Sequence, residues 1–217
     1  LNKFFDKGTV TGYLAGSGYS VVTTIAPMLL VIADILAMQK ILGYSDAAYG
    51  SRQLFQATIL YIFVFALLAS APLNAVLSRY VSDVIFNETY SDIMAAFHLG
   101  LWISMAIDAI MVVPFAIHEY IVGGVDIVYV VTSVCCFIAL SLVFYTMLYL
   151  SLCKDYGKIS LFYFIGMAIT LGISYIFVNK FNMEITYSML LAMTIGFIII
   201  ASLGYALLRQ YFTQNSK

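Results

Sequence analysis

The chain has 217 residues, of which 63% are hydrophobic, 16% aromatic and only 10% charged. It has too few polar side chains to cover a water-soluble globule, so the composition excludes a soluble fold and indicates a membrane protein. The formal net charge of −1 provides no broad basic surface, so nucleic acid is not an expected partner.

Uncharged stretches long enough to cross a bilayer define the predicted helices, because a hydrocarbon core of about 30 Å needs about 20 helical residues. Five follow from the gaps between charged residues, and a sixth is interrupted only by Asp108. Their approximate bounds are 11–42, 53–78, 93–118, 127–153, 159–179 and 185–208. None alternates with the period of two expected of a membrane strand. We therefore predict an all-α, polytopic bundle of six transmembrane helices.

Basic residues predict the orientation of this bundle, because they gather on the cytoplasmic side of a membrane. With both termini in the cytoplasm, seven of the ten basic residues lie inside: Lys3, Lys7, Arg79, Lys154, Lys158, Arg209 and Lys217. The other three lie outside: Lys40, Arg52 and Lys180. Six spans with both ends inside are typical of one lobe of a two-lobed transporter, although other six-helix proteins share this topology. We expect the second lobe to lie outside this chain.

The first span contains a carboxylate that does not belong in lipid. At about 100° per residue, one stripe about 60° wide holds five residues: Gly16, Ser20, Thr23, Pro27 and Asp34. A charge in the bilayer is costly, so this stripe is predicted to face other helices. We interpret Asp34 as a candidate for cation coupling or for lining a water-filled cavity. The alternative is a neutral or hydrogen-bonded residue that only fixes packing.

Pro27 lies on the same stripe and is predicted to kink the first helix, because proline removes a backbone hydrogen bond. Bent helices often line cavities in transporters, so we expect this kink to flex during transport. Prolines are also simply more frequent in membrane helices than in soluble ones, which is the plainer alternative.

The second span ends in a charged pair. Arg79 and Asp83 are four residues apart, so they share one helix face at the predicted cytoplasmic boundary. An ion pair there could open or close with the helix angle, which makes the two residues a candidate cytoplasmic gate. A snorkelling arginine with a neighbouring acid among the headgroups explains the same spacing.

The third span carries the second intramembrane carboxylate. Ala96, Gly100, Ser104 and Asp108 follow one another at intervals of four, so Asp108 shares a face with small residues. That face is predicted to contact protein. Asp108 is a second candidate for cation coupling, with the same packing alternative as the first carboxylate.

The fourth span contains hydroxyl groups that could line a conduit for sugars. Tyr129 and Ser133 lie in its outer half, and Tyr145 and Tyr149 lie on another side of its inner half. These four residues are the candidate conduit. Most such side chains in membrane bundles instead bond to neighbouring helices, which remains the alternative for each.

Signatures of enzymes and metal sites are absent from the sequence. The two histidines, His98 and His118, have no metalloprotease spacing, and no P-loop, nucleophile elbow or dinucleotide-binding glycine pattern occurs. The cysteines Cys135, Cys136 and Cys153 lie in or next to one apolar stretch without metal-ligand spacing. We therefore expect no catalysis, no metal and no cofactor.

Three segments resemble a known family. The string FALLASAPLNAVLSRYVSDVIFNETYSDIMAAFHLGL resembles the Pel exopolysaccharide exporter family (PelG), with Arg79, Tyr80 and Asp83 matching its pattern. YLSLCKDYGKISLFYFIGMAIT is similar to the family's link between its fourth and fifth helices, with matches at Lys154, Asp155, Tyr156 and Gly166. LNKFFDKGTVTGYLAGSGYSVVTTIAPMLL is similar to its first helix. It differs in having SGYS where a Gly-Pro-Trp form is common, and the expected GIGFEL-type motif is absent.

This resemblance implies membership of the multidrug/oligosaccharide-lipid/polysaccharide (MOP) exporter superfamily, with two six-helix lobes of which this chain matches the first. It implies export of an amino-sugar polysaccharide across the bacterial cytoplasmic (inner) membrane for biofilm matrix. The implied partners are membrane lipid, the polysaccharide cargo, a cytosolic glycosyltransferase and other membrane subunits of a secretion complex. Some relatives couple transport to cations through a first-helix carboxylate, which corresponds here to Asp34.

Two alternatives to polysaccharide export stay open. One is a multidrug or lipid-linked oligosaccharide flippase of the same superfamily, with the same architecture and a smaller cargo. The other is a membrane scaffold that anchors a polysaccharide synthase without transporting anything.

Overall fold

The computed structural model describes residues 10–87, 91–153 and 156–214, without the side chains of 10–24, 85, 91–92 and 213–214. Some residues used in the sequence argument lie outside this description. They are the basic residues Lys3, Lys7, Lys154 and Lys217, together with Asp155, and the side chains of Ser20 and Thr23.

Six long α-helices and one short 3₁₀-helix make up the secondary structure of the described residues, which contain no strand. They are α2 (Val10–Ile41), η1 (Tyr44–Asp46), α3 (Tyr49–Phe86), α4 (Ser91–Ile121), α5 (Ile127–Leu152), α6 (Tyr156–Phe181) and α7 (Ile185–Gln214). The predicted all-α class is confirmed.

Five of the helices are long and apolar enough to cross a membrane, as judged from the described side chains: α3, α4, α5, α6 and α7. The sixth, α2, has 32 residues, about 48 Å at 1.5 Å per residue, but the side chains of its first half lie outside the description. The protein is a multi-pass membrane protein.

Local signals explain where these helices begin and end. Gly43 follows α2 with φ of 67°, a left-handed conformation that glycine adopts without strain, and so turns the chain into η1. The Asp126 carboxylate accepts a hydrogen bond from the Val128 amide at 3.2 Å and caps α5. The predicted second span ends at Ser78, but no proline or glycine follows it in this helix. α3 therefore continues to Phe86.

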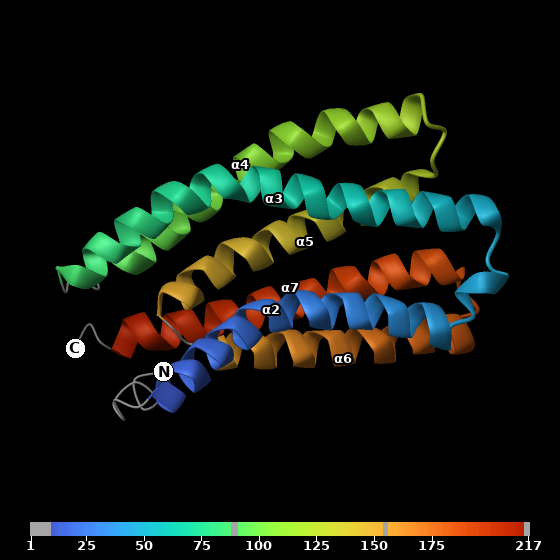
Figure 1. Ribbon diagram of the computed structural model, residues 1–217. Coiled ribbons are helices and arrows are strands. Elements are labelled where there is room, and N and C mark those ends of the chain that lie inside the picture. The colour runs from blue at the N-terminus through green and yellow to red at the C-terminus, as the bar shows by residue number, and fades with distance from the viewer. Residues whose placement is uncertain (1–9, 88–90, 154–155, 215–217) are drawn as a thin grey trace.

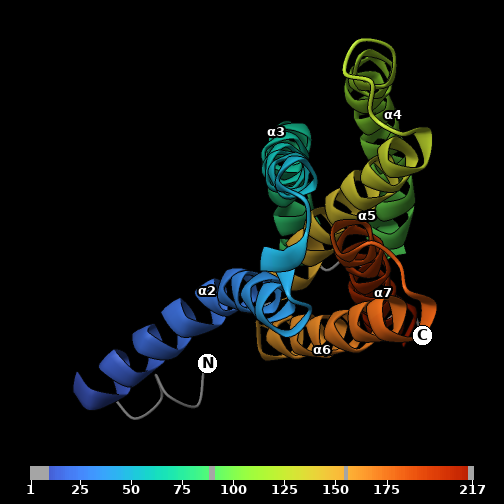
Figure 2. The same cartoon turned by 90° about the vertical axis from the view of Figure 1, so that its right-hand side faces the viewer.

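Two helices, α5 and α7, lie at the centre of the bundle, as Figures 1 and 2 show. α5 and α7 contact each other most extensively, with α3 and α4 on one side and α6 and α2 on the other. In α5 and α7, half of the most apolar stretch is buried, against 17% to 28% in α3, α4 and α6. The outer helices therefore leave most of their apolar surface for lipid or another protein surface.

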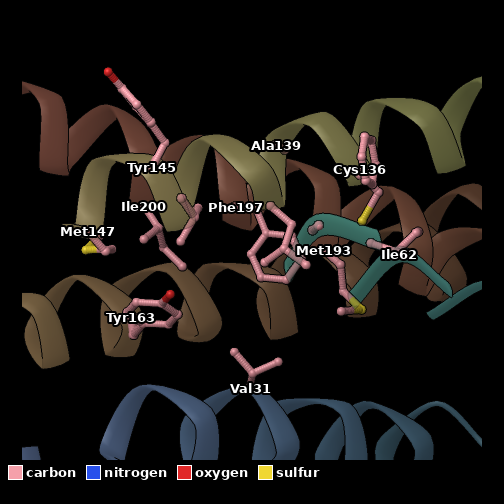
Figure 3. Close-up of a cluster of buried hydrophobic side chains, with 14 of the residues drawn as sticks. Val31, Ile62, Cys136, Ala139, Tyr145, Met147, Tyr163, Met193, Phe197 and Ile200 are labelled. Atoms are coloured by element: carbon pink, nitrogen blue, oxygen red, sulfur yellow. The ribbon is translucent and has the colours of Figure 1, made fainter. Parts of the chain in front are cut away.

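The core lies where α7 passes between α5 and α6. Phe197 and Ile200 of α7 are fully buried there, with Ala139 of α5 and Tyr163 of α6 around them (Figure 3). Gly196 of α7 comes directly against Thr170 of α6, where any side chain would collide. Small residues at such crossings let two membrane helices approach closely, which is the main source of their attraction.

Candidate functional site

Asp34 lies in the C-terminal half of α2, the helix that packs against α6. Its side chain is only 3% exposed, and neither carboxylate oxygen has a hydrogen-bond partner among the described residues. A buried polar group without a partner carries the full cost of its desolvation, so such groups are usually explained by a ligand, a proton or a functional change of state. Asp34 is therefore a strong candidate for a functional group in α2.

A cleft of about 590 Å³ separates α2 from α3, although the two helices follow each other in the chain. Its α2 wall includes Pro27 and Ile35, its α3 wall includes Phe63, and Phe144 of α5 and Tyr163 of α6 form its floor. The lining is largely apolar. Sequence reasoning missed this cleft, because no local signal shows that consecutive helices are held apart.

The predicted kink position lies in the middle of α2. Figures 1 and 2 show that α2 bends near its middle and that its N-terminal half diverges from α6. Pro27 lies within this helix and on the wall of the cleft between α2 and α3. A change in this bend would alter the width of the cleft.

Asp108 lies in α4 and is buried against α5. It is 1% exposed, and both carboxylate oxygens lack a hydrogen-bond partner among the described residues. The Ser141 hydroxyl of α5 lies close enough to interact with the carboxylate, but not in hydrogen-bond geometry. Asp34 and Asp108 belong to different helix interfaces, one on each side of the α5–α7 centre.

A second cavity, of about 110 Å³, lies between the N-terminal halves of α3 and α5 and the C-terminal half of α4. Tyr129 and Ser133, two of the four candidate conduit residues, line it together with Thr58 and Glu119. The Tyr129 hydroxyl donates to the Thr58 hydroxyl oxygen at 3.3 Å, and Ser133 donates to the Tyr129 carbonyl at 2.8 Å. The hydroxyl groups of Tyr129 and Ser133 therefore both donate hydrogen bonds within the protein.

The other two conduit candidates occupy a different place. Tyr145 and Tyr149 are each 1% exposed and pack with Phe97 of α4, with ring centroids 5.1 and 5.0 Å from the Phe97 ring. Tyr145 donates to the Phe97 carbonyl at 2.7 Å. Neither tyrosine lines the cavities described above. In this conformation the packing alternative describes both residues better than a role in a conduit.

The predicted gate residues lie at the end of α3. Arg79 and Asp83 are one turn apart, but no ion pair joins them in the described structure. Tyr80, between them, is exposed. This turn is available to a partner surface, and the pairing itself stays a prediction.

The short helix η1 connects α2 to α3 at one end of the bundle. The Tyr44 hydroxyl donates to the Arg52 carbonyl at 2.9 Å, which holds η1 against the start of α3. Burial raises the pKa of the Tyr44 phenol, and the Arg52 guanidinium opposes this change. Tyr44 therefore remains a neutral donor at physiological pH. Sequence reasoning missed this contact, whose only signal was an aromatic residue between two helices.

No group of three or more His, Cys, Asp or Glu side chains that could hold a metal ion occurs among the described residues. The buried carboxylates are each single, and the polar neighbour of Asp108 carries a hydroxyl group. Divalent and transition metals usually need several charged or soft ligands, so these sites have a different chemistry.

Comparison with known proteins gives one family. The family model described as "PelG: Putative exopolysaccharide Exporter (EPS-E)" matches residues 1–217, which is the whole chain. No curated protein and no solved structure matches.

Proposed function

Because the chain belongs to the PelG family of exopolysaccharide exporters, we propose that it forms one six-helix lobe of an exporter for an extracellular, Pel-like polysaccharide. The lobe works by alternating access in the bacterial inner membrane, with both termini in the cytoplasm. The observation that carries this proposal is the family match over residues 1–217. The multi-pass helical bundle supports it, since five described helices could each cross a membrane.

The cleft between α2 and α3 supports alternating access. A second lobe packed over these two helices would convert the open cleft of about 590 Å³ into part of an enclosed cavity. Rocking of two lobes around a central site opens such a cavity first to one side of the membrane and then to the other. The bend in α2 lies on the wall that would have to move.

Cation coupling is the proposed role of the buried carboxylates. Intramembrane carboxylates are expensive to maintain and commonly mark ion or proton pathways. Asp34 does not itself line the cleft, but Val31 and Ile35 on neighbouring faces of α2 do, so the carboxylate lies close behind this wall. Binding of a cation to Asp34 would neutralise the carboxylate, so the position of α2 would depend on whether the cation is bound.

The lobe's proposed partners follow from the same function. The polysaccharide enters from the cytoplasmic side, where a glycosyltransferase would supply the growing chain. Further membrane subunits of the secretion complex complete the path, and the lobe itself catalyses no reaction.

The Asp34→Asn substitution tests the coupling role of this residue. The amide keeps the shape of the side chain and removes its charge, so we expect export to be lost while the protein still inserts into the membrane. Secreted polysaccharide is measured in a strain that has only the variant, with membrane levels measured by immunoblot. Asp46→Asn, in the short helix η1, is the matched control and should secrete normally. Normal secretion by the Asp34 variant would remove Asp34 from the mechanism.

Deletion of the gene tests the cargo. If the protein exports exopolysaccharide, the deletion should abolish surface polysaccharide and leave the sensitivity to toxic cations and dyes unchanged. The reverse result would favour a multidrug flippase. Secretion that survives crosslinking of the two lobes would favour the scaffold alternative.

A further inference from the structure

Asp108 and Ser141 form a buried oxygen cluster in the contact between α4 and α5. Their side chains are 1% and 0% exposed, and three oxygen atoms, both of Asp108 and the hydroxyl of Ser141, lack a hydrogen-bond partner among the described residues. Unpaired oxygens that face one another across a helix interface are costly to bury. The arrangement therefore calls for a ligand that oxygen atoms can share.

The register of the two helices directs both side chains toward the same point. Gly100 of α4 lies directly against the Tyr145 hydroxyl of α5. Asp108 lies about two turns after Gly100 in α4, and Ser141 lies about one turn before Tyr145 in α5. Because the two helices are antiparallel, both steps run in the same direction. Side chains lean toward the N-terminus of their own helix. Asp108 and Ser141 therefore lean toward each other.

A further buried hydroxyl group lies on the face of α3 that meets α4. The Leu77 side chain also lies against the Gly100 position, 3.3 Å from the place that a Cβ atom on Gly100 would occupy. Ser70 lies seven residues before Leu77, on the same face of α3 and about 10 Å along the helix. Ser70 is buried and donates its proton to the Leu67 carbonyl at 3.2 Å, which leaves the lone pairs of its oxygen available.

No described basic side chain neutralises this carboxylate. Asp108 takes part in no ion pair among the described residues, and the polar neighbour that interacts with it is a serine. A single carboxylate beside a neutral hydroxyl group balances one positive charge. A divalent cation would leave a net charge in a low-dielectric interior, where it usually needs more carboxylates or water.

We propose that Asp108 and Ser141 bind a monovalent metal cation, with Na⁺ as the ion, and the Ser70 hydroxyl of α3 is a candidate further ligand. Hard oxygen ligands suit this ion, and sites for coupling ions lie within the membrane bundle of many transporters. Binding of Na⁺ at this place does not depend on the cargo. Its use as the coupling ion rests on the proposed export function.

Binding of ²²Na⁺ to the purified native protein in detergent tests the site directly. Choline replaces Na⁺ to hold ionic strength constant, and thermal stability is measured in parallel. We expect saturable binding and a rise in melting temperature with Na⁺. Asp108→Asn should abolish both effects, and Ser141→Ala should weaken binding on the order of tenfold.

Two control variants distinguish the loss of a Na⁺ site from general destabilisation of the protein. Glu119→Gln changes a carboxylate on the same helix α4, near its end, and should bind Na⁺ like the unaltered protein. Ser174→Ala removes a buried hydroxyl that donates within its own helix, to the Leu171 carbonyl at 2.9 Å, and should also bind normally. All variants must elute as a single species in size-exclusion chromatography.

Unchanged binding in Asp108→Asn, or a stability that responds to pH but not to Na⁺, would overturn the cation site. The second result would identify a proton as the ligand. The Asp108→Asn variant could lose Na⁺ binding and still export polysaccharide. That result would support the binding site and refute its coupling role. Failure of the site and failure of the proposed function are thus distinguishable.

Discussion

Arg79 and Asp83 stand one turn apart at the end of α3, without an ion pair between them in the described structure. If they form a gate with a partner surface, reversal of either charge should reduce export, and the double swap Arg79→Asp with Asp83→Arg should restore it. Stability should change by less than about 0.5 kcal/mol, because surface pairs at this spacing contribute little. Polysaccharide secretion and membrane levels are the measurements. A double swap no better than the single variants would refute the gate.

The burial of the two intramembrane carboxylates could be predicted from the sequence, but their surroundings could not. Asp34 and Asp108 each share a helix face with small residues, and both are buried in the structure. Ser141, which faces Asp108, is on another helix, and spacing within one helix says nothing about which helix lies opposite. The functional roles of both carboxylates remain proposals.

The tyrosines of α5 show the same limit. Tyr129 lies at a cavity and Tyr145 lies in an aromatic cluster, yet both are amphipathic residues in one apolar span. The helical spacing separates them onto two sides of the helix. What each side meets depends on α3, α4 and α7, whose positions were not predictable.

At the scale of the helices, close packing of α4 on α5 depends on Gly100. A methyl group there would overlap the Tyr145 hydroxyl oxygen, whereas the nearest ring carbon of Tyr145 is 3.3 Å away. Gly100→Ala should therefore destabilise the protein by about 1 to 3 kcal/mol through overpacking. Adding Tyr145→Phe should relieve part of this loss, because it removes the overlapping atom. The four proteins of this double-mutant cycle are compared by thermal unfolding in detergent.

Gly172→Ala in α6 provides the control, since no atom lies near the added carbon at this helical position. Alanine favours a helix over glycine by about 0.5 to 1 kcal/mol, so this variant should be as stable as the unaltered protein or more so. A Gly100→Ala protein with the same gain would show that the α4–α5 contact can relax. Equal losses with and without the Tyr145 hydroxyl would place the strain elsewhere.

Helix positions could be predicted because charges and turn residues interrupt the apolar runs. The predicted fourth span, 127–153, differs from α5 by a single residue at its end. The second span was underestimated, because Arg79 and Asp83 stop the apolar run without stopping the helix. Helix neighbours could not be predicted, since helices that are apolar on all sides carry no stripe that separates lipid from protein.

At the scale of the whole molecule, the helices surround a centre made by α5 and α7, and α2 and α3 diverge around a cleft. This arrangement explains why the two carboxylates lie in separate interfaces. One lies beside a cleft that a second lobe could cover, and the other lies inside the α3–α4–α5 group. A cation at Asp108 would thus stabilise one group of helices, and a charge at Asp34 would act on α2, the helix that the export proposal requires to move.

Orientation in the membrane is the property of the whole molecule that the basic residues predict. The α3–α4 connection follows Arg79, and the α4–α5 connection contains no basic residue, so the two should lie on opposite sides, with the first in the cytoplasm. Single cysteines at Asn87 and Val122, both exposed, report on these connections in a protein whose native cysteines are replaced. A membrane-impermeant maleimide should label Val122→Cys in intact spheroplasts.

Asn87→Cys should react with the same reagent only after the membrane is permeabilised. Because α4 has 31 residues, about 46 Å, it is long enough to separate the two positions by a full bilayer. Labelling of Asn87→Cys alone in intact cells would reverse the topology and place the gate residues outside. Labelling of both from one side would show that α4 does not cross the membrane, which would contradict the architecture on which the export proposal depends.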